Sequence, residues 1–168
     1  MTSRWRAAAL LLAGSAVGLT PLGAQESGVT VGTAAPAVVV NDLDGRPVDL
    51  GRYLGKKPLF LEFWATWCEQ CEELLPELRA AQSRFGNKVE FFGINVTVNQ
   101  TPELVRQYLE SRQPGFRVLY DDQGASIRAY EVPATSYVVI VDRAGKVAYT
   151  GVGGTQDFEA VLHKVASK

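Results

Sequence analysis

The chain has 168 residues, of which 46% are hydrophobic and 21% are charged, and these values are typical of one ordinary globular domain. Its 17 basic and 18 acidic side chains give a net charge of −1, which does not indicate a nucleic-acid-binding protein. Two cysteines and one histidine exclude a framework of several disulfides and a histidine-rich metal site, so any special chemistry must lie in a compact segment.

The N-terminal segment has the features of a secretory signal peptide. Arg4 and Arg6 give a basic start, residues 7–19 form an uncharged and mostly apolar run, and small residues follow it. A membrane-spanning helix needs about 20 residues, which is more than this run provides. We therefore expect a signal peptide over 1–24 and one exported domain over 25–168, in the periplasm or another extracytoplasmic space. An uncleaved membrane anchor is the alternative.

The exported domain is expected to begin with a short hairpin, followed by a buried strand and a long helix. An apolar stretch that runs into a turn sequence predicts the hairpin over 37–45. Residues 58–64 are almost continuously apolar, which is typical of a strand buried on both faces, although the carboxylate of Glu62 interrupts it. After Trp67 the apolar residues follow helical spacing as far as Phe85, which predicts a long helix.

The second half of the domain is expected to alternate strands with helices. Apolar runs predict strands over 89–98, 116–120, 137–141 and 146–152. Helices are predicted after Thr101 as a cap, over 125–130, and after Thr155 as the cap of the last helix. The buried side of the helix after Thr101 is expected to carry Leu104, Val105, Tyr108 and Leu109. This order predicts an α/β fold, with a central mixed β-sheet and helices on both faces.

Two cysteines three positions apart, Cys68 and Cys71, follow the buried strand and begin the long helix. At a helix N-terminus, the unpaired backbone N–H groups and the helix dipole favour a thiolate at the first cysteine. Cys68 is therefore the expected nucleophile, which forms a mixed disulfide with a substrate that Cys71 then resolves. The charges of Glu69, Glu72 and Glu73 oppose this stabilisation, which argues against a strongly oxidising protein.

A purely structural disulfide and a metal site are the two alternatives for the cysteine pair. A disulfide that closes so short a loop would contribute only about 2 kcal/mol to stability, roughly half the contribution of a long-range bridge. A structural zinc ion takes four protein ligands, and the single histidine, His163, falls on the polar side of the last helix. A metal-binding carrier would need ligands from a second chain, so we expect no metal and no cofactor.

The segment Phe63–Cys71, with the sequence FWATWCEQC and with Pro76 five residues later, resembles the active site of thioredoxin-fold proteins. From residue 31 to the C-terminus, further features of the sequence resemble those of the TlpA/ResA-type exported thiol-disulfide oxidoreductases. These features are Gly32, Pro36, Asp44-Gly45, Leu54-Gly55-Lys56 and a strand-helix insert over 89–116. The resemblance implies a thioredoxin-like fold and dithiol-disulfide exchange with exported protein thiols or disulfides, often in cytochrome c maturation. We expect a monomer, and a reducing role implies a membrane electron donor.

The strand and the helix depart from the pattern of that family at two positions. Glu62 aligns with the buried acid of cytoplasmic thioredoxins, where the exported family often has asparagine. Burial would raise the pKa of this carboxyl, which could then exchange a proton with Cys71. The alternative is a structural carboxylate paired with Lys56 or Lys57. Leu74 stands where related cytochrome-maturation proteins have a glutamate, which weakens the inference of an apocytochrome substrate.

The loop that faces the cysteines is a third departure. The family typically has a cis-proline before the next strand, but that position falls on Ser136 here. A non-proline cis bond costs roughly 3 kcal/mol, so we expect a trans peptide and an altered groove. The alternative is a cis bond before Pro133. The groove residues are expected to be Trp67, Glu69, Gln70, Pro133, Thr135 and Ser136.

A thiol peroxidase is the alternative enzyme, because residues 36–50 also resemble peroxiredoxins. Those enzymes carry a Pro-x-x-x-Thr-x-x-Cys motif around the reactive cysteine. In this chain Leu61 and Ala65 stand at the proline and threonine positions, so the motif is missing.

Overall fold

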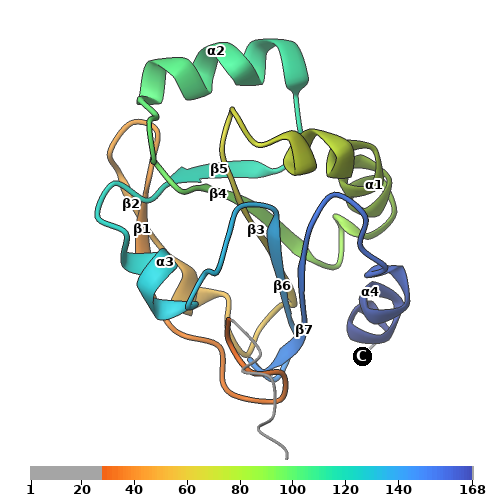
Figure 1. Cartoon of the computed structure of the whole chain (residues 1–168). Coiled ribbons are helices and arrows are strands. Elements are labelled where there is room, and N and C mark those ends of the chain that lie inside the picture. The colour runs from red at the N-terminus through yellow and green to blue at the C-terminus, as the bar shows by residue number, and fades with distance from the viewer. Residues whose placement is uncertain (1–27, 168) are drawn as a thin grey trace, which may run out of the picture.

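The computed structural model describes residues 28–167 and contains one seven-stranded sheet with helices packed around it (Figure 1). The strands are β1 (Val39–Asp42), β2 (Pro47–Asp49), β3 (Leu59–Trp64), β4 (Glu90–Asn95), β5 (Arg117–Tyr120), β6 (Tyr137–Val141) and β7 (Val147–Val152). The helices are a short 3-10 turn, η1 (Leu50–Arg52), and α1 (Glu69–Phe85), α2 (Pro102–Arg112), α3 (Ala125–Ala129) and α4 (Glu159–Ala166). The predicted signal peptide over 1–24 lies outside the described residues.

The sheet is mixed, as predicted, with the strand order β2-β1-β5-β4-β3-β6-β7. β3 pairs in parallel with β4 and antiparallel with β6, and β4 pairs in parallel with β5. The hairpin predicted over 37–45 is formed by β1 and β2, although β2 lies beyond the predicted range, and the two strands extend the sheet beyond β5. All six residues of β3 are buried, because both faces of the strand are covered and a neighbour lies on each edge. β3 therefore carries the following segment out from the centre of the sheet.

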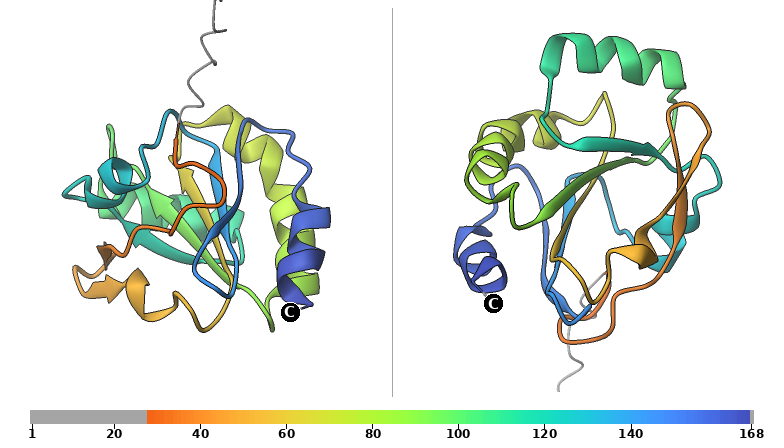
Figure 2. Two further views of the ribbon diagram at one scale, coloured as in Figure 1. Left: turned by 90° about the horizontal axis from the view of Figure 1, so that it is seen from below. Right: turned by 180° about the vertical axis from the view of Figure 1, so that it is seen from behind.

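The two faces of the sheet carry different helices. Figure 2 shows α1 and α4 side by side on one face, with α3 and η1 on the other. Successive residues of a strand point to opposite faces, and the buried side chains accordingly form two clusters. The cluster on the side of α1 and α4 includes Phe60, Leu74, Leu78, Ile140 and Leu162. The other cluster includes Leu61, Phe63, Ile94, Val139 and Tyr130. Helices on both faces were predicted from the alternation of elements, and this is confirmed.

The beginning of α4 differs from the sequence prediction. α4 starts at Glu159, its N-cap is Phe158, and no side chain caps it, so the predicted cap at Thr155 is wrong. The reason is the buried side chain of Gln156, whose Nε2 donates hydrogen bonds to the carbonyl oxygens of Ser136 (2.9 Å) and Gly153 (2.7 Å). These bonds hold the preceding residues in a loop against the sheet.

The helix of the insert, α2, begins as predicted but buries less than predicted. Thr101 is its N-cap and accepts a hydrogen bond from the Leu104 N–H at 3.2 Å. The predicted burial of Leu104 is wrong, since 47% of this residue is exposed. Val105 is the one fully buried residue of α2, because the helix lies beside the beginning of α1 instead of covering a face of the sheet (Figure 1).

Candidate active site

Cys68 and Cys71 form a disulfide at the N-terminus of α1, four residues after the end of β3. Cys68 is the N-cap residue, and its sulfur accepts a hydrogen bond from the Cys71 N–H at 3.1 Å. The N–H groups at this end of a helix lack partners within the helix, and together with the helix dipole they stabilise negative charge. Both cysteines are nearly covered, with 4% of Cys68 and 2% of Cys71 exposed. The site can therefore stabilise a thiolate at Cys68 although little of that residue is exposed to solvent.

The residues next to the disulfide remain accessible. Half of Trp67 is exposed, and its indole Nε1 donates a hydrogen bond to the carbonyl oxygen of Val98 at 2.8 Å. Glu69 and Gln70 are exposed in the first turn of α1. The loop after β7 approaches the same turn, because a Cβ atom added to Gly154 would lie 3.1 Å from the Gln70 carbonyl oxygen. These groups border the disulfide at the protein surface.

Ser136 directly precedes β6, and its side chain points into the protein. No peptide bond among residues 28–167 is cis, in agreement with the expected trans peptide before Ser136, and the alternative of a cis bond before Pro133 is wrong. The Ser136 hydroxyl donates to the Gly153 carbonyl oxygen at 2.9 Å, and the residue has a φ of 60°. Pro133 is exposed and Thr135 is partly buried. The side chain of Ser136 is thus engaged within the fold.

Glu62 is a buried carboxyl group in the middle of β3. Only 1% of the residue is exposed, and its Oε1 has no hydrogen-bond partner among residues 28–167. Burial raises the pKa of Glu62 to about 8, because the charged form loses its solvation. The alternative pairing with Lys56 or Lys57 is wrong, since Lys56 is exposed and Lys57 Nζ lies 2.6 Å from Glu90 Oε1.

An aromatic pair from β3 and α2 lies beside Glu62. Trp64 faces the same side of β3 as Glu62, and its ring centroid is 5.2 Å from that of Tyr108 on α2. The charge of Glu62 is among the influences that raise the pKa of Tyr108 above its usual range, after burial and the carboxylate of Glu72. Arg112 Nε lies 3.0 Å from both carboxylate oxygens of Glu72, which ties α2 to the first turn of α1. The insert therefore covers the Glu62 side of the active site.

These contacts of the insert were not identified from the sequence as parts of the site. The helical spacing predicts that Tyr108 lies on the buried side of its helix, but it does not reveal that Tyr108 packs on Trp64. Val98 lies in a segment expected to be strand, whereas β4 ends at Asn95 and Val98 follows in a loop. The local signal that could have indicated a loop is the polar sequence Thr97-Val98-Asn99-Gln100, in which only one residue is apolar.

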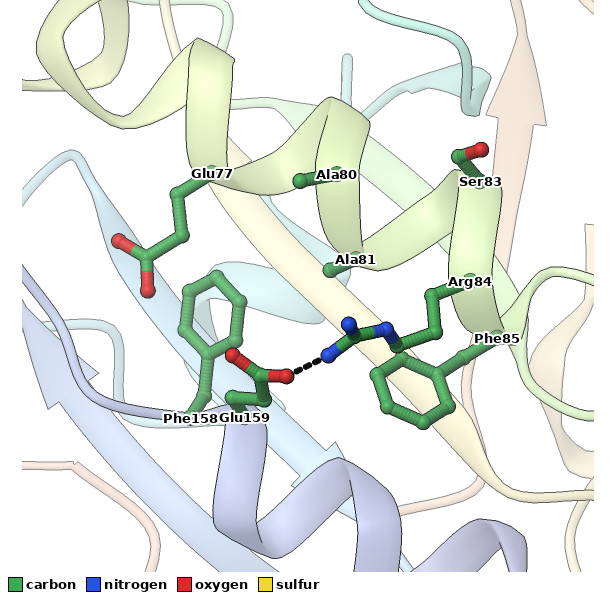
Figure 3. A pocket seen from close by; sticks show the side chains of 8 residues that line it. All are labelled: Glu77, Ala80, Ala81, Ser83, Arg84, Phe85, Phe158 and Glu159. Carbon is green, nitrogen blue, oxygen red and sulfur yellow. Dashed lines mark hydrogen bonds and ion pairs between the residues drawn. The ribbon is translucent and has the colours of Figure 1, made fainter.

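The groove between α1 and α4 is a separate feature, with a volume of about 530 Å³ (Figure 3). Its lining includes Glu77, Ala80, Phe85, Phe158 and an ion pair between Arg84 and Glu159, which Figure 3 shows reaching across from one helix to the other. It lies toward the C-terminal end of α1, whereas the disulfide lies at the N-terminal end. The groove is therefore not part of the disulfide site.

Metal-ligating side chains are not clustered in the part of the chain that the structure describes. No group of three or more His, Cys, Asp or Glu side chains in residues 28–167 is placed to hold a metal ion. His163 is exposed, as predicted, and its ring packs edge-on against Phe85 at a centroid distance of 4.9 Å. Cys68 and Cys71 are engaged with each other in the disulfide.

Comparisons with known proteins agree with this site. The family model described as Redoxin matches residues 30–164. Thiol-disulfide oxidoreductase ResA of Bacillus cereus is 31% identical over 85% of this chain and 83% of its own length. ResA of Geobacillus thermodenitrificans is 32% identical over 84% of this chain and 81% of its own length.

Solved structures show the same fold. The thioredoxin domain of a thiol-disulfide oxidoreductase from Bacteroides vulgatus superposes with a TM-score of 0.70 at 22% identity, over 82% of this chain and 99% of that chain. A thioredoxin family protein from Chlorobium tepidum superposes with a TM-score of 0.67 at 24% identity, over 80% of this chain and 96% of that chain. The predicted thioredoxin-like fold is confirmed.

Proposed function

Since the chain belongs to the Redoxin family and is a thiol-disulfide oxidoreductase, we propose that it exchanges electrons with exported protein thiols or disulfides through Cys68 and Cys71. The observation that carries this proposal is the disulfide itself, which lies at a helix N-terminus directly after a buried strand. A bridge that spans only three positions constrains the unfolded chain little, so a redox role explains the pair better than a stabilising role.

In the reducing direction, the Cys68 thiolate attacks one sulfur of the substrate disulfide. That S–S bond breaks, a mixed disulfide forms, and the departing substrate thiolate takes up a proton. The Cys71 thiol then loses its proton and attacks Cys68, which releases the second substrate thiolate and closes the Cys68–Cys71 disulfide. Two electrons pass to the substrate, and the reverse sequence oxidises a substrate dithiol.

We assign the proton transfer at Cys71 to Glu62. A buried thiol needs a base nearby, because its surroundings disfavour the thiolate. Cys71 is only 2% exposed on α1, and α1 packs on the face of the sheet to which Phe60 and Glu62 point. A carboxyl group with a pKa of about 8 can both accept and return a proton near neutral pH.

The proposed location is extracytoplasmic, and the support for it is the signal-like sequence of residues 1–24. Among the described residues, no helix is both long and apolar enough to cross a membrane. A reductant outside the cytoplasm needs a supply of electrons, so the proposal includes a membrane electron donor. We also propose that the protein is a monomer, that it needs no cofactor and that it does not bind nucleic acid.

The site does not favour the thiol peroxidase alternative. Peroxide reduction in the peroxiredoxin motif relies on a threonine three residues before the reactive cysteine. Ala65 stands there and is buried, so it offers no hydroxyl group, and Leu61 is also buried.

The test is turnover of a protein disulfide, with insulin as substrate and dithiothreitol as reductant. The unsubstituted protein is expected to accelerate reduction, Cys68→Ser to abolish the acceleration, and Cys71→Ser to accumulate a mixed disulfide that mass spectrometry detects. Equal loss in both variants, with no trapped species in either, would refute the assignment of roles.

A further inference from the structure

Trp67 and Val98 form an exposed apolar pair beside the disulfide, which we call the apolar ledge. Trp67 directly precedes Cys68, and 50% of Trp67 and 56% of Val98 are exposed. The indole Nε1 of Trp67 donates to the Val98 carbonyl oxygen at 2.8 Å, so the two residues are neighbours although they come from different segments. The apolar ledge thus combines the cysteine segment with the insert.

The backbone on both sides of Val98 has a conformation that side chains rarely adopt. Thr97 has a φ of 61° and Asn99 a φ of 52°, both in the left-handed region. Hydrogen bonds fix this conformation, because the Thr97 N–H donates to Asn95 Oδ1 at 3.0 Å and its hydroxyl donates to the Asp121 carbonyl oxygen at 3.3 Å. Such strain is often found at functional sites. Here it holds an apolar side chain in solvent.

The end of the same loop is bonded to the cysteine segment. Gln100 Oε1 accepts a hydrogen bond from the Thr66 N–H at 2.9 Å and another from Asn95 Nδ2 at 3.2 Å. The Tyr120 hydroxyl donates to the Gln100 carbonyl oxygen at 3.0 Å. Thr66 lies two residues before Cys68, so the position of Val98 relative to the disulfide is fixed.

We propose that the apolar ledge binds the polypeptide around the reacting cysteine of the substrate protein and selects a cysteine with an apolar neighbour. This inference rests on the proposed function. A mixed disulfide with Cys68 holds the substrate chain beside Trp67, so the occupant of the apolar ledge is the substrate itself. Burial of an apolar side chain there stabilises the complex, because it removes apolar surface of both chains from water.

The charge next to the apolar ledge favours a basic residue in the same substrate segment. Glu69 is exposed on α1, two residues after Trp67, and it forms no ion pair within residues 28–167. Glu72 is already paired with Arg112. A lysine or arginine near the substrate cysteine would complement the carboxylate of Glu69.

The test compares two synthetic peptides, each a mixed disulfide of its single cysteine with glutathione. In one peptide leucines flank the cysteine, and in the other serines flank it. The rate constant of the reduced full-length protein is measured with each peptide. We expect the leucine peptide to react about tenfold faster, and Val98→Ser to reduce this ratio to about one. Val98→Leu should keep the ratio, and Val39→Ser should leave it unchanged, because Val39 is equally exposed but lies on β1.

An unchanged ratio in Val98→Ser, or an equal loss in Val39→Ser, would overturn the proposal. A dimer in analytical ultracentrifugation that Val98→Ser dissociates would also overturn it, since the apolar ledge would then bind a second copy of the chain. Failure of the proposed function gives a different result, in which the unsubstituted protein reacts with neither peptide nor glutathione disulfide.

Discussion

The middle of β3 and the loop between β5 and α3 each bury one acidic side chain, and the two environments are opposite. Asp121 and Glu62 are both 1% exposed. Asp121 accepts hydrogen bonds from the backbone N–H groups of Ala125, Ser126 and Ile127 and from the Ser126 hydroxyl, at distances of 2.6 to 3.0 Å. Glu62 Oε1 has no hydrogen-bond partner within the described part of the chain, and the pKa of Glu62 is raised to about 8.

Burial of Asp121 with its hydrogen bonds stabilises the fold, whereas burial of Glu62 lowers its stability. Hydrogen bonds to a charged acceptor offset its loss of hydration, so Asp121 stabilises the beginning of α3. An unpartnered buried carboxyl group is unfavourable, and the apolar neighbours of Glu62 in β3 show that an apolar side chain would suit the strand. A buried acid at a position where an apolar side chain would be more stable supports the proposed role of Glu62 in the chemistry at Cys71.

Asp121→Ala tests the structural side of this comparison and has the largest expected effect. Three backbone N–H groups and a hydroxyl lose their acceptor, so the free energy of unfolding should fall by about 3 kcal/mol. Urea denaturation of the oxidised protein measures this change. Asp122→Ala is the matched control, since Asp122 is exposed beside it and should change stability by less than about 0.5 kcal/mol. Equal effects of the two substitutions would contradict the assignment.

Glu62→Gln tests the buried carboxyl group of β3 through the pH dependence of the free energy of unfolding. The folded protein holds the Glu62 proton more tightly than the unfolded chain does, because the pKa rises from 4.5 to about 8 on folding. The cost of ionising Glu62 is therefore absent below pH 4.5, where the carboxyl group is protonated in both states, and stability is lost as the pH rises toward 8, by about 3 kcal/mol at pH 7. Denaturation at several pH values should show this decline in the unsubstituted protein and its absence in Glu62→Gln. Parallel curves would show that Glu62 has an ordinary pKa.

Ser136→Pro extends the comparison to a buried polar group that is satisfied. Ser136 has a φ of 60°, which proline cannot adopt, and its hydroxyl is bonded to Gly153. The substitution should lower the free energy of unfolding by about 2 kcal/mol, whereas Ser136→Gly tolerates the backbone and should cost about 1 kcal/mol. Thermal denaturation distinguishes them. If Ser136→Pro is as stable as the original, the loop must adopt another conformation.

Tyr108→Ala tests whether α2 shields Glu62 from solvent. Removal of the ring that packs on Trp64 opens a path for water, so the pKa of Glu62 should fall by about one unit toward its usual value. NMR titration of the Glu62 carboxyl carbon measures it. Tyr108→Phe keeps the ring and should keep the raised pKa. The same pKa in both variants would mean that α2 does not shield Glu62.

The sequence predicted those parts of the molecule that depend on local pattern. The run over 58–64 and the cysteines after it correctly placed β3, the start of α1 and the disulfide, because strand burial, helix start and cysteine spacing are contiguous signals. The burial of Glu62 also followed from its position in an apolar run. The absence of an ion pair between Glu62 and Lys57 could not be predicted, since that lysine could reach either Glu62 or Glu90. Only the packed structure decides between them.

Contacts between distant segments could not be predicted in this way. The meeting of Trp64 with Tyr108, and of Trp67 with Val98, depends on how the insert folds back toward α1. The left-handed backbone of Ser136 was equally hidden, because serine has no preference for that conformation. The loop that stands before α4 in place of the predicted helix start forms because Gln156 is hydrogen-bonded to Ser136, 20 residues earlier in the sequence.

Release of glutathione from a mixed disulfide at Cys68 tests the central claim most directly, because only the attack by Cys71 is then observed. In the unsubstituted protein the rate should rise with pH through about 8, as Glu62 becomes able to accept the Cys71 proton. In Glu62→Gln the rate should be at least about tenfold lower at pH 7, without that rise at pH 8. Identical rates and pH profiles in the two proteins would contradict a role for Glu62 in the exchange.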